Sequence, residues 1–228
     1  LQDSGVEVIH IGHNRSAKEV VDAAIEEDAQ GIAVSSYQGG HVEYFKYMVD
    51  LLRERGASRI RIFGGGGGVI IPSEMDELQA YGVTRIYSPE DGSKMGLQGM
   101  INDMIRSMDA PSVEYESLDY SGLTVDNKYV TANFISAVQE ACASHRDKLE
   151  EIMARIHKIG HDRDVPIIGL TGTGGAGKSS LTDELINRML RDLGDVNIAI
   201  ISCDPSRRKT GGALLGDRIR MNSIETGR

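Results

Sequence analysis

Residues 169–180 read GLTGTGGAGKSS. Within them, Gly172 to Ser179 fits the pattern G-x-x-x-x-G-K-[ST] at every required position. The glycines of this pattern allow successive backbone N–H groups to converge on a phosphate, and the following helix adds the positive end of its dipole. An ordinary glycine-rich turn between a strand and a helix is the alternative. The stretch predicts a site for a purine nucleoside triphosphate with magnesium.

The pattern gives its polar side chains separate tasks. We expect Lys178 to reach the β- and γ-phosphates and Ser179 to ligate Mg²⁺. The remaining contacts to the nucleotide are expected from Gly174, Gly175, Ala176, Gly177 and Ser180.

The flanking sequence predicts an α/β arrangement for this half of the chain. Residues 165–172 (VPIIGLTG) are typical of a buried strand, residues 178–193 of a helix, and residues 196–202 of a second strand. Asp204 follows that strand, where an acidic side chain can hold a magnesium-bound water. We therefore count Asp204 as a candidate metal-site residue and, together with Lys178, as a candidate catalytic residue.

The next segment, DPSRRKTGGALLGDR at residues 204–218, is basic and rich in glycine. One interpretation is a switch that responds to the γ-phosphate, and the other is a solvated basic loop.

The first 106 residues alternate between short apolar runs and amphipathic segments. Expected strands are residues 6–11, 31–36, 59–63 and 84–87, and expected helices are residues 16–28, 41–55, 72–80 and 93–108. Ser16 with Glu19 three residues later predicts a capping box. Leu1 to Gly5 is typical of the last turn and C-cap of a helix. The alternation predicts a parallel sheet with helices on both faces.

Composition and charge exclude some classes of partner. The net charge of −9 argues against a general nucleic-acid or membrane-surface role, because those roles favour a basic face. No apolar run approaches 18 residues, so no membrane span is expected. Cys142 and Cys203 lack metal-ligand or redox spacing, which indicates reduced thiols in a cytoplasmic protein. The chain does not begin with Met, and we expect it to be a piece of a longer protein.

Five consecutive glycines, Gly64 to Gly68, follow the third expected strand. Such a run is favoured where a bulky ligand or another backbone approaches closely. A nicotinamide dinucleotide site would also need an acidic residue about 20 positions on, where the sequence has Arg85, Ile86 and Tyr87. A pocket for another ligand and a flexible turn remain as interpretations.

A second group of polar residues ends the neighbouring strand. Ser35, Ser36 and Tyr37 lie at the carboxyl edge, where open α/β sheets bind ligands. The serine hydroxyls can bond a ligand nitrogen, or they can cap the helix that follows.

The composition changes after residue 108. Residues 109–127 are polar and predict a linker, and residues 128–160 keep helical spacing throughout. We divide the chain into a first domain at 1–108, a linker and long helix at 109–160, and the beginning of a P-loop domain at 161–228.

Residues 1–108 resemble the cobalamin-binding domain of coenzyme B12-dependent acyl-CoA mutases. The resemblance is carried by Ser35-Ser36-Tyr37 and by GGGGGVIIPSE at residues 64–74. It implies a flavodoxin-like sheet in which Ser35 hydrogen-bonds the dimethylbenzimidazole tail while Gly67 and Gly68 make room for it. Tyr37 stands where that family usually has Leu.

Residues 129–223 resemble the G-protein chaperones of the same mutases, on the motifs GLTGTGGAGKSS and DPSRRKTGGALLGDRIRMNS. The two halves in this order are similar to the fused isobutyryl-CoA mutases, in which a substrate barrel follows. The resemblance implies a flavodoxin-like domain followed by a P-loop NTPase domain, both incomplete here. It also implies adenosylcobalamin, Mg²⁺ and GTP or GDP as cofactors, a homodimer, and an adenosyltransferase that delivers cobalamin. The preference for GTP over ATP is implied by the resemblance alone.

One motif of the cobalamin family is not in the sequence. Its D-x-H-x-x-G, whose His binds cobalt, is expected upstream of Leu1. The flavodoxin-like strand order 2-1-3-4-5 places the strand of that motif centrally, so we expect a gap in the sheet.

The function implied is an isomerase that rearranges isobutyryl-CoA to n-butyryl-CoA, fused to a GTP-hydrolysing domain that gates cofactor loading. The acyl-CoA is expected to bind through the barrel, and this chain alone is not expected to isomerise it. Two alternatives stay open. One is a cobalamin-loading GTPase chaperone without mutase activity. The other is a regulatory receiver-like domain joined to an ATPase, although a receiver needs acidic strand ends where this chain has Ser35 and Gly64.

Overall fold

The computed structural model describes residues 1–109, 113–160, 165–194 and 196–202. The chain divides into two units, of which the larger comprises residues 10–161 and the smaller residues 1–9 with 162–228.

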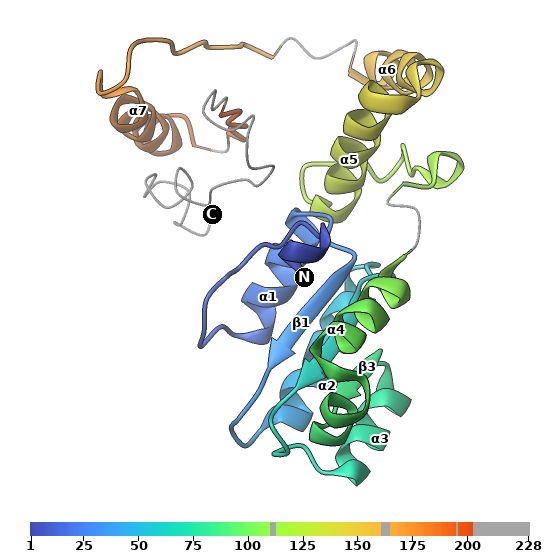
Figure 1. Cartoon of the computed structure of the whole chain (residues 1–228). Coiled ribbons are helices and arrows are strands. Elements are labelled where there is room, and N and C mark those ends of the chain that lie inside the picture. The colour runs from blue at the N-terminus through green and yellow to red at the C-terminus, as the bar shows by residue number, and fades with distance from the viewer. Residues whose placement is uncertain (110–112, 161–164, 195, 203–228) are drawn as a thin grey trace. The chain divides into compact units, whose positions relative to one another are not determined.

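A parallel three-stranded sheet organises the larger unit (Figure 1). Its strands are β1 (Gly31–Ser35), β2 (Arg61–Gly65) and β3 (Arg85–Tyr87), in the order β1-β2-β3. Ser35 pairs with Gly65, and Gly65 pairs with Tyr87, so the three strands end level with one another. The parallel α/β sheet predicted from the alternating pattern is confirmed, although β2 begins two residues later than expected and extends into the glycine run.

Helices cover both faces of this sheet, as predicted. They are α1 (Ala17–Glu26), α2 (His41–Glu54), α3 (Pro72–Tyr81) and α4 (Pro89–Met108). Figure 1 shows α4 in front of the sheet and α2 and α3 behind it. The core is apolar and fully enclosed around Phe45 and Met48 of α2, Ile62 of β2 and Leu78 of α3.

The helix starts follow local capping chemistry. The predicted capping box is present at α1, where the Glu19 N–H donates to Ser16 Oγ at 3.2 Å and the Ser16 N–H donates to Glu19 Oε2 at 2.8 Å. The expected start of the fourth helix at residue 93 was wrong. Ser88 caps α4 with Asp91 in a second capping box, and Pro89 occupies the first turn, so the helix begins four residues earlier.

Two glycines of the run are required by the protein's own packing. A Cβ on Gly64 would lie 2.6 Å from Phe45 Cζ and 2.5 Å from Ile86 Cδ1, both in the core. A Cβ on Gly66 would overlap the carbonyl oxygen of Ser36. The close approach of another backbone, one of the reasons expected for the run, is therefore found at Gly66.

This packing predicts different costs for two neighbouring substitutions. Gly64→Ala should lower the free energy of unfolding by about 1–3 kcal/mol, because the added methyl overpacks the core. Gly65→Ala is the matched control, since its Cβ would approach nothing closer than 3.7 Å. Hydrogen exchange of the β2 and α2 amides in rising urea would measure both, and equal protection in the two variants would contradict the expectation.

The expected strand at residues 6–11 is wrong: this segment has no regular secondary structure and pairs with no described strand. A strand exists only through the hydrogen bonds it makes with a neighbour. The resemblance implies that the neighbour of this segment is the strand of the D-x-H-x-x-G motif, which is not in the sequence. The last turn expected before it is present as a short 3₁₀ helix, Gln2–Ser4, ended by Gly5 with φ of 87°.

Residues 113–160 fold back on themselves instead of forming a linker and one long helix. Helix α5 (Lys128–Ser144) ends at His145, and α6 (Arg146–Gly160) follows it directly. Ala137 and Ala141 of α5 and Ile152 of α6 are almost completely buried, and Val113 is buried in the same apolar cluster. A single straight helix would leave these apolar faces in water, which is why the chain turns at His145.

The start of α5 contacts the part of the larger unit that contains the sheet. The Lys128 ammonium lies 2.7 Å from the Glu26 carboxylate at the end of α1. Arg59 pairs with Asp28, donates to Asn133 Oδ1 at 2.6 Å, and lies 5.5 Å from the centre of the Tyr129 ring. Helix α5 is therefore packed on α1 and on the loop before β2.

The smaller unit contains helix α7 (Lys178–Asp192), at the position expected. The strands expected on either side of it, at residues 165–172 and 196–202, are wrong for the described structure, which has no ladder there. Ile167 is 94% exposed and Ile201 is 90% exposed. Runs of this kind become buried parallel strands only between neighbouring strands and under helices, and the described residues of this unit provide no such neighbours.

Candidate functional site

The ends of β1 and β2 bring the two predicted groups of cobalamin-site residues into contact. The Ser36 N–H donates to the carbonyl oxygen of Gly65 at 2.8 Å. Gly66 is packed on the carbonyl of Ser36, so the two loops that leave these strands touch through their backbones. Ser35, at the end of β1, stays exposed at the same edge.

Gly67 and Gly68 form the exposed part of the glycine run. Both are exposed and have positive φ angles, of 56° and 92°. A Cβ on Gly67 would lie 2.8 Å from the Tyr37 ring, and one on Gly68 would lie 3.4 Å from Pro89 Cγ. Tyr37 is itself 68% exposed. The structure thus places all four predicted cobalamin-site residues, Ser35, Tyr37, Gly67 and Gly68, at one edge of the sheet.

Sequence reasoning missed one pair at this edge, His41 with Glu74. The His41 side chain, the first residue of α2, is only 8% exposed. Its Nε2 lies 3.0 Å from Glu74 Oε2, and its Nδ1 lies 3.2 Å from the carbonyl oxygen of Gln38. The hydrogen bond to Glu74 raises the pKa of His41 above its ordinary value, against the opposing effect of burial. The same hydrogen bond lowers the pKa of Glu74.

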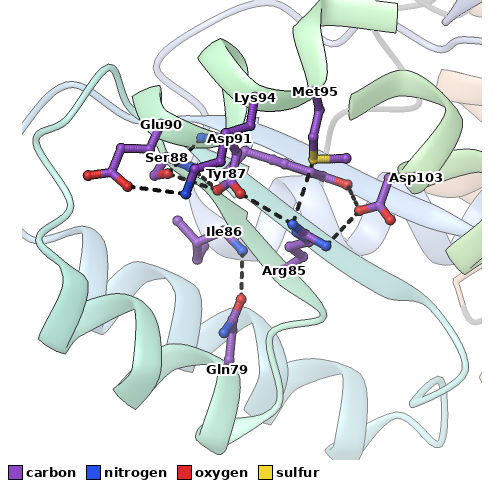
Figure 2. Close-up of polar contacts among 10 residues, drawn as sticks. All are labelled: Gln79, Arg85, Ile86, Tyr87, Ser88, Glu90, Asp91, Lys94, Met95 and Asp103. Carbon is purple, nitrogen blue, oxygen red and sulfur yellow. Dashed lines mark hydrogen bonds and ion pairs between the residues drawn. The ribbon is translucent and has the colours of Figure 1, made fainter. Parts of the chain in front are cut away.

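A second polar cluster lies on the outer strand (Figure 2). Arg85 of β3 pairs with Asp91 at 3.3 Å and with Asp103 at 3.0 Å, and both carboxylates belong to α4. The Tyr87 hydroxyl donates to Asp103 at 2.8 Å, and burial raises the pKa of that hydroxyl. These groups satisfy one another and hold α4 on β3.

A cavity of about 480 Å³ opens beside this cluster, between α3 and β3. Its walls include Met75, Gln79, Val83 and Arg85. Because none of the residues predicted to bind cobalamin or nucleotide lines it, the cavity is separate from the sites expected from the sequence.

The nucleotide loop in the smaller unit is shaped by its glycines. Gly175 and Gly177 have φ of 79°, and Gly177 is the N-cap of α7 without any side-chain cap. The Lys178 ammonium donates to the carbonyl oxygens of Gly172 and Thr173, both at 2.9 Å. The loop thus gathers the lysine cation and the uncapped N–H groups of α7 at one place, which is the arrangement that binds phosphate.

The remaining predicted nucleotide-site residues can be placed in part. Ser179 and Ser180 are exposed in the first turn of α7, and Gly174 and Ala176 lie in the exposed loop before it. Asp204 and the switch segment 204–218 lie outside the described residues. Within the ranges that the structure describes, no three His, Cys, Asp or Glu side chains are grouped as a metal site would require, and no helix there has the length and apolar character to cross a bilayer.

Comparison with known proteins finds two family matches that divide the chain. Residues 1–91 match the B12 binding domain, and residues 131–228 match the methylmalonyl Co-A mutase-associated GTPase MeaB. The first match covers the edge that holds Ser35 and the glycine run, and the second covers the phosphate loop.

Three curated relatives are similar along essentially the whole chain, and each is a fused isobutyryl-CoA mutase. The one from Geobacillus kaustophilus is 56% identical over 100% of this chain. Those from Cupriavidus metallidurans and Nocardia farcinica are 58% and 51% identical over 98% and 99% of it. The matched part is 21%, 20% and 20% of these relatives, so the chain spans about a fifth of their length.

Proposed function

The chain carries a B12-binding domain followed by a MeaB-type GTPase domain, and on this premise we propose that it is part of an adenosylcobalamin-dependent acyl-CoA mutase. The reaction proposed is the rearrangement of isobutyryl-CoA to n-butyryl-CoA. The observation that carries the proposal is the order of the two domains, shared along the whole chain with fused isobutyryl-CoA mutases.

The residues at the sheet edge suit the nucleotide tail of a cobalamin. Gly67 and Gly68 offer backbone without side chains, and Ser35, whose strand partner is Gly65, is exposed at the same edge. A buried heterocycle needs both close backbone approach and a polar partner, and this edge supplies both. When bound, adenosylcobalamin supplies the radical chemistry, while Ser35, Tyr37 and the two glycines hold its tail.

The phosphate loop is proposed to bind GTP and GDP with Mg²⁺. Lys178 faces the phosphates, Ser179 ligates the metal, and Asp204 holds a water of its shell. Hydrolysis at this loop is proposed to gate cofactor loading and to protect the mutase. We further propose a cytoplasmic homodimer that receives cobalamin from an adenosyltransferase and binds acyl-CoA through a domain outside this chain.

The activity is tested with a polypeptide of the relatives' full length that contains this chain. Supplied with adenosylcobalamin, it should convert isobutyryl-CoA to n-butyryl-CoA, and it should hydrolyse GTP. Binding of cobalamin with GTP hydrolysis but without isomerisation of any acyl-CoA would favour the chaperone alternative instead.

Ser35→Ala is expected to weaken adenosylcobalamin binding by about 0.5–1.5 kcal/mol, the usual contribution of one hydrogen bond. Ser36→Ala is the matched control, because Ser36 contacts the glycine run through its backbone. Titration of cobalamin followed by visible absorption would measure both affinities. A larger loss of cobalamin affinity for Ser36→Ala than for Ser35→Ala would contradict the assignment of the tail contact to Ser35.

A further inference from the structure

The pair of His41 and Glu74 joins the two loops that form the cobalamin edge. His41 opens α2 directly after the loop 36–40, which leaves β1. Glu74 lies in the first turn of α3, directly after the loop 66–71, which leaves β2. The side-chain contact therefore connects the segment that carries Tyr37 with the segment that carries Gly67 and Gly68.

Both ring nitrogens of His41 face acceptors. Nε2 faces the Glu74 carboxylate, and Nδ1 faces the Gln38 carbonyl, which is part of the first loop itself. A neutral imidazole has a single N–H and can satisfy only one of them, whereas the imidazolium donates to both. Glu74 Oε2 also accepts from the Ile71 N–H at 3.0 Å, so the same oxygen fixes the second loop.

We propose that the His41 imidazolium and the Glu74 carboxylate act together as a positioning pair that holds these two loops at the spacing required by the cobalamin tail. This inference rests on the proposed cobalamin site. Neither side chain touches the reacting centre, because both act through the backbone of the loops.

The electrostatic surroundings favour the charged form of His41. The charged groups that act on it are Glu74 on α3 and Glu43 on α2, and both raise the pKa of His41. Because that pKa is raised, the pair stabilises the folded edge fully below the ordinary pKa of histidine and loses this effect as pH rises through the raised value. Because the pKa of Glu74 is lowered, the contribution of Glu74 is lost only in acid.

The test uses two ligands and a polypeptide of the relatives' full length. Adenosylcobalamin carries the nucleotide tail, and adenosylcobinamide is the same corrin without it. His41→Ala should weaken adenosylcobalamin binding about 10-fold or more, as expected for the loss of a hydrogen bond to a charged group, and leave adenosylcobinamide binding unchanged. The parent's affinity for adenosylcobalamin should also decrease as pH rises through the raised pKa of His41, while its affinity for adenosylcobinamide should not.

Two further variants keep the test decisive if His41→Ala fails to fold. Glu74→Gln keeps an acceptor but removes the charge, and it should move the pH dependence of adenosylcobalamin binding to lower pH. Glu77→Gln is the control, because the pair of Lys46 and Glu77 also joins α2 to α3 but lies further along both helices from the loops and is less buried than the pair of His41 and Glu74. It should bind both ligands as the parent does.

The outcomes distinguish a failure of the positioning role from a failure of the proposed cobalamin site. A parent that binds neither ligand contradicts the cobalamin site itself. If the parent binds cobalamin but His41→Ala weakens the binding of both ligands equally or of neither, the positioning role is overturned. An unchanged pH dependence of adenosylcobalamin binding in Glu74→Gln overturns it as well.

Discussion

Lys178→Ala is expected to abolish the binding of GTP and GDP. In the structure the Lys178 ammonium already lies on the phosphate loop, 2.9 Å from two of its carbonyl oxygens. With nucleotide bound, the same cation would donate to the β- and γ-phosphates. Losing two charge-assisted hydrogen bonds should raise Kd at least about 100-fold.

Calorimetric titration with and without Mg²⁺ would measure this effect. Arg188→Ala is the matched control on the same helix, because the Arg188 guanidinium is paired with Glu184 at 2.7 Å. Ser179→Ala should weaken mainly the part of the affinity that depends on Mg²⁺. Unchanged affinity in Lys178→Ala would show that the loop is not a phosphate site.

Gly67→Val is expected to reduce adenosylcobalamin affinity about 10- to 100-fold, because a branched side chain would occupy the space of the tail. The substitution also places valine at a positive φ, which is strained by itself. Gly56→Val separates the two effects, since Gly56 has φ of 70° with nothing near its Cβ.

The prediction is checked by titrating Gly67→Val and Gly56→Val with adenosylcobalamin and with adenosylcobinamide. Only the combination of Gly67→Val with the ligand that carries the tail should show the loss. If Gly67→Val binds adenosylcobalamin as tightly as the parent, the glycine run has another purpose.

The larger unit was largely predictable because its signals are local. Ser16 with Glu19 defines a helix start by itself. The run before Ser35 is apolar, the run before Gly64 alternates arginine with apolar residues, and both are flanked by helical spacing. The strands around the phosphate loop were not predictable in the same way. An apolar run such as residues 165–172 indicates that the segment can be buried. Whether it pairs as a strand depends on neighbouring strands from elsewhere in the protein.

Some residues of the candidate site were likewise predictable from the sequence, and one was not. The glycine run and Ser35 stand out in the sequence by composition and by position at strand ends. The sequence has three histidines expected near this edge, His10, His13 and His41, and nothing in it sets His41 apart, because burial and a partner 33 residues away are properties of the fold. The one available signal was its place at the start of a helix that follows Gly39 and Gly40.

The packing of α5 on α1 bears on how the two domains can be separated. The MeaB match begins at residue 131, inside α5, whereas α5 and α6 belong to the same unit as the sheet. Cutting the gene where the match begins would break α5 and strip Lys128 and Tyr129 from the rest of their helix. A boundary placed after α6 would keep the hairpin with its partners. The border of the family match, at residue 131, therefore differs from the border of the folded unit, at residue 161.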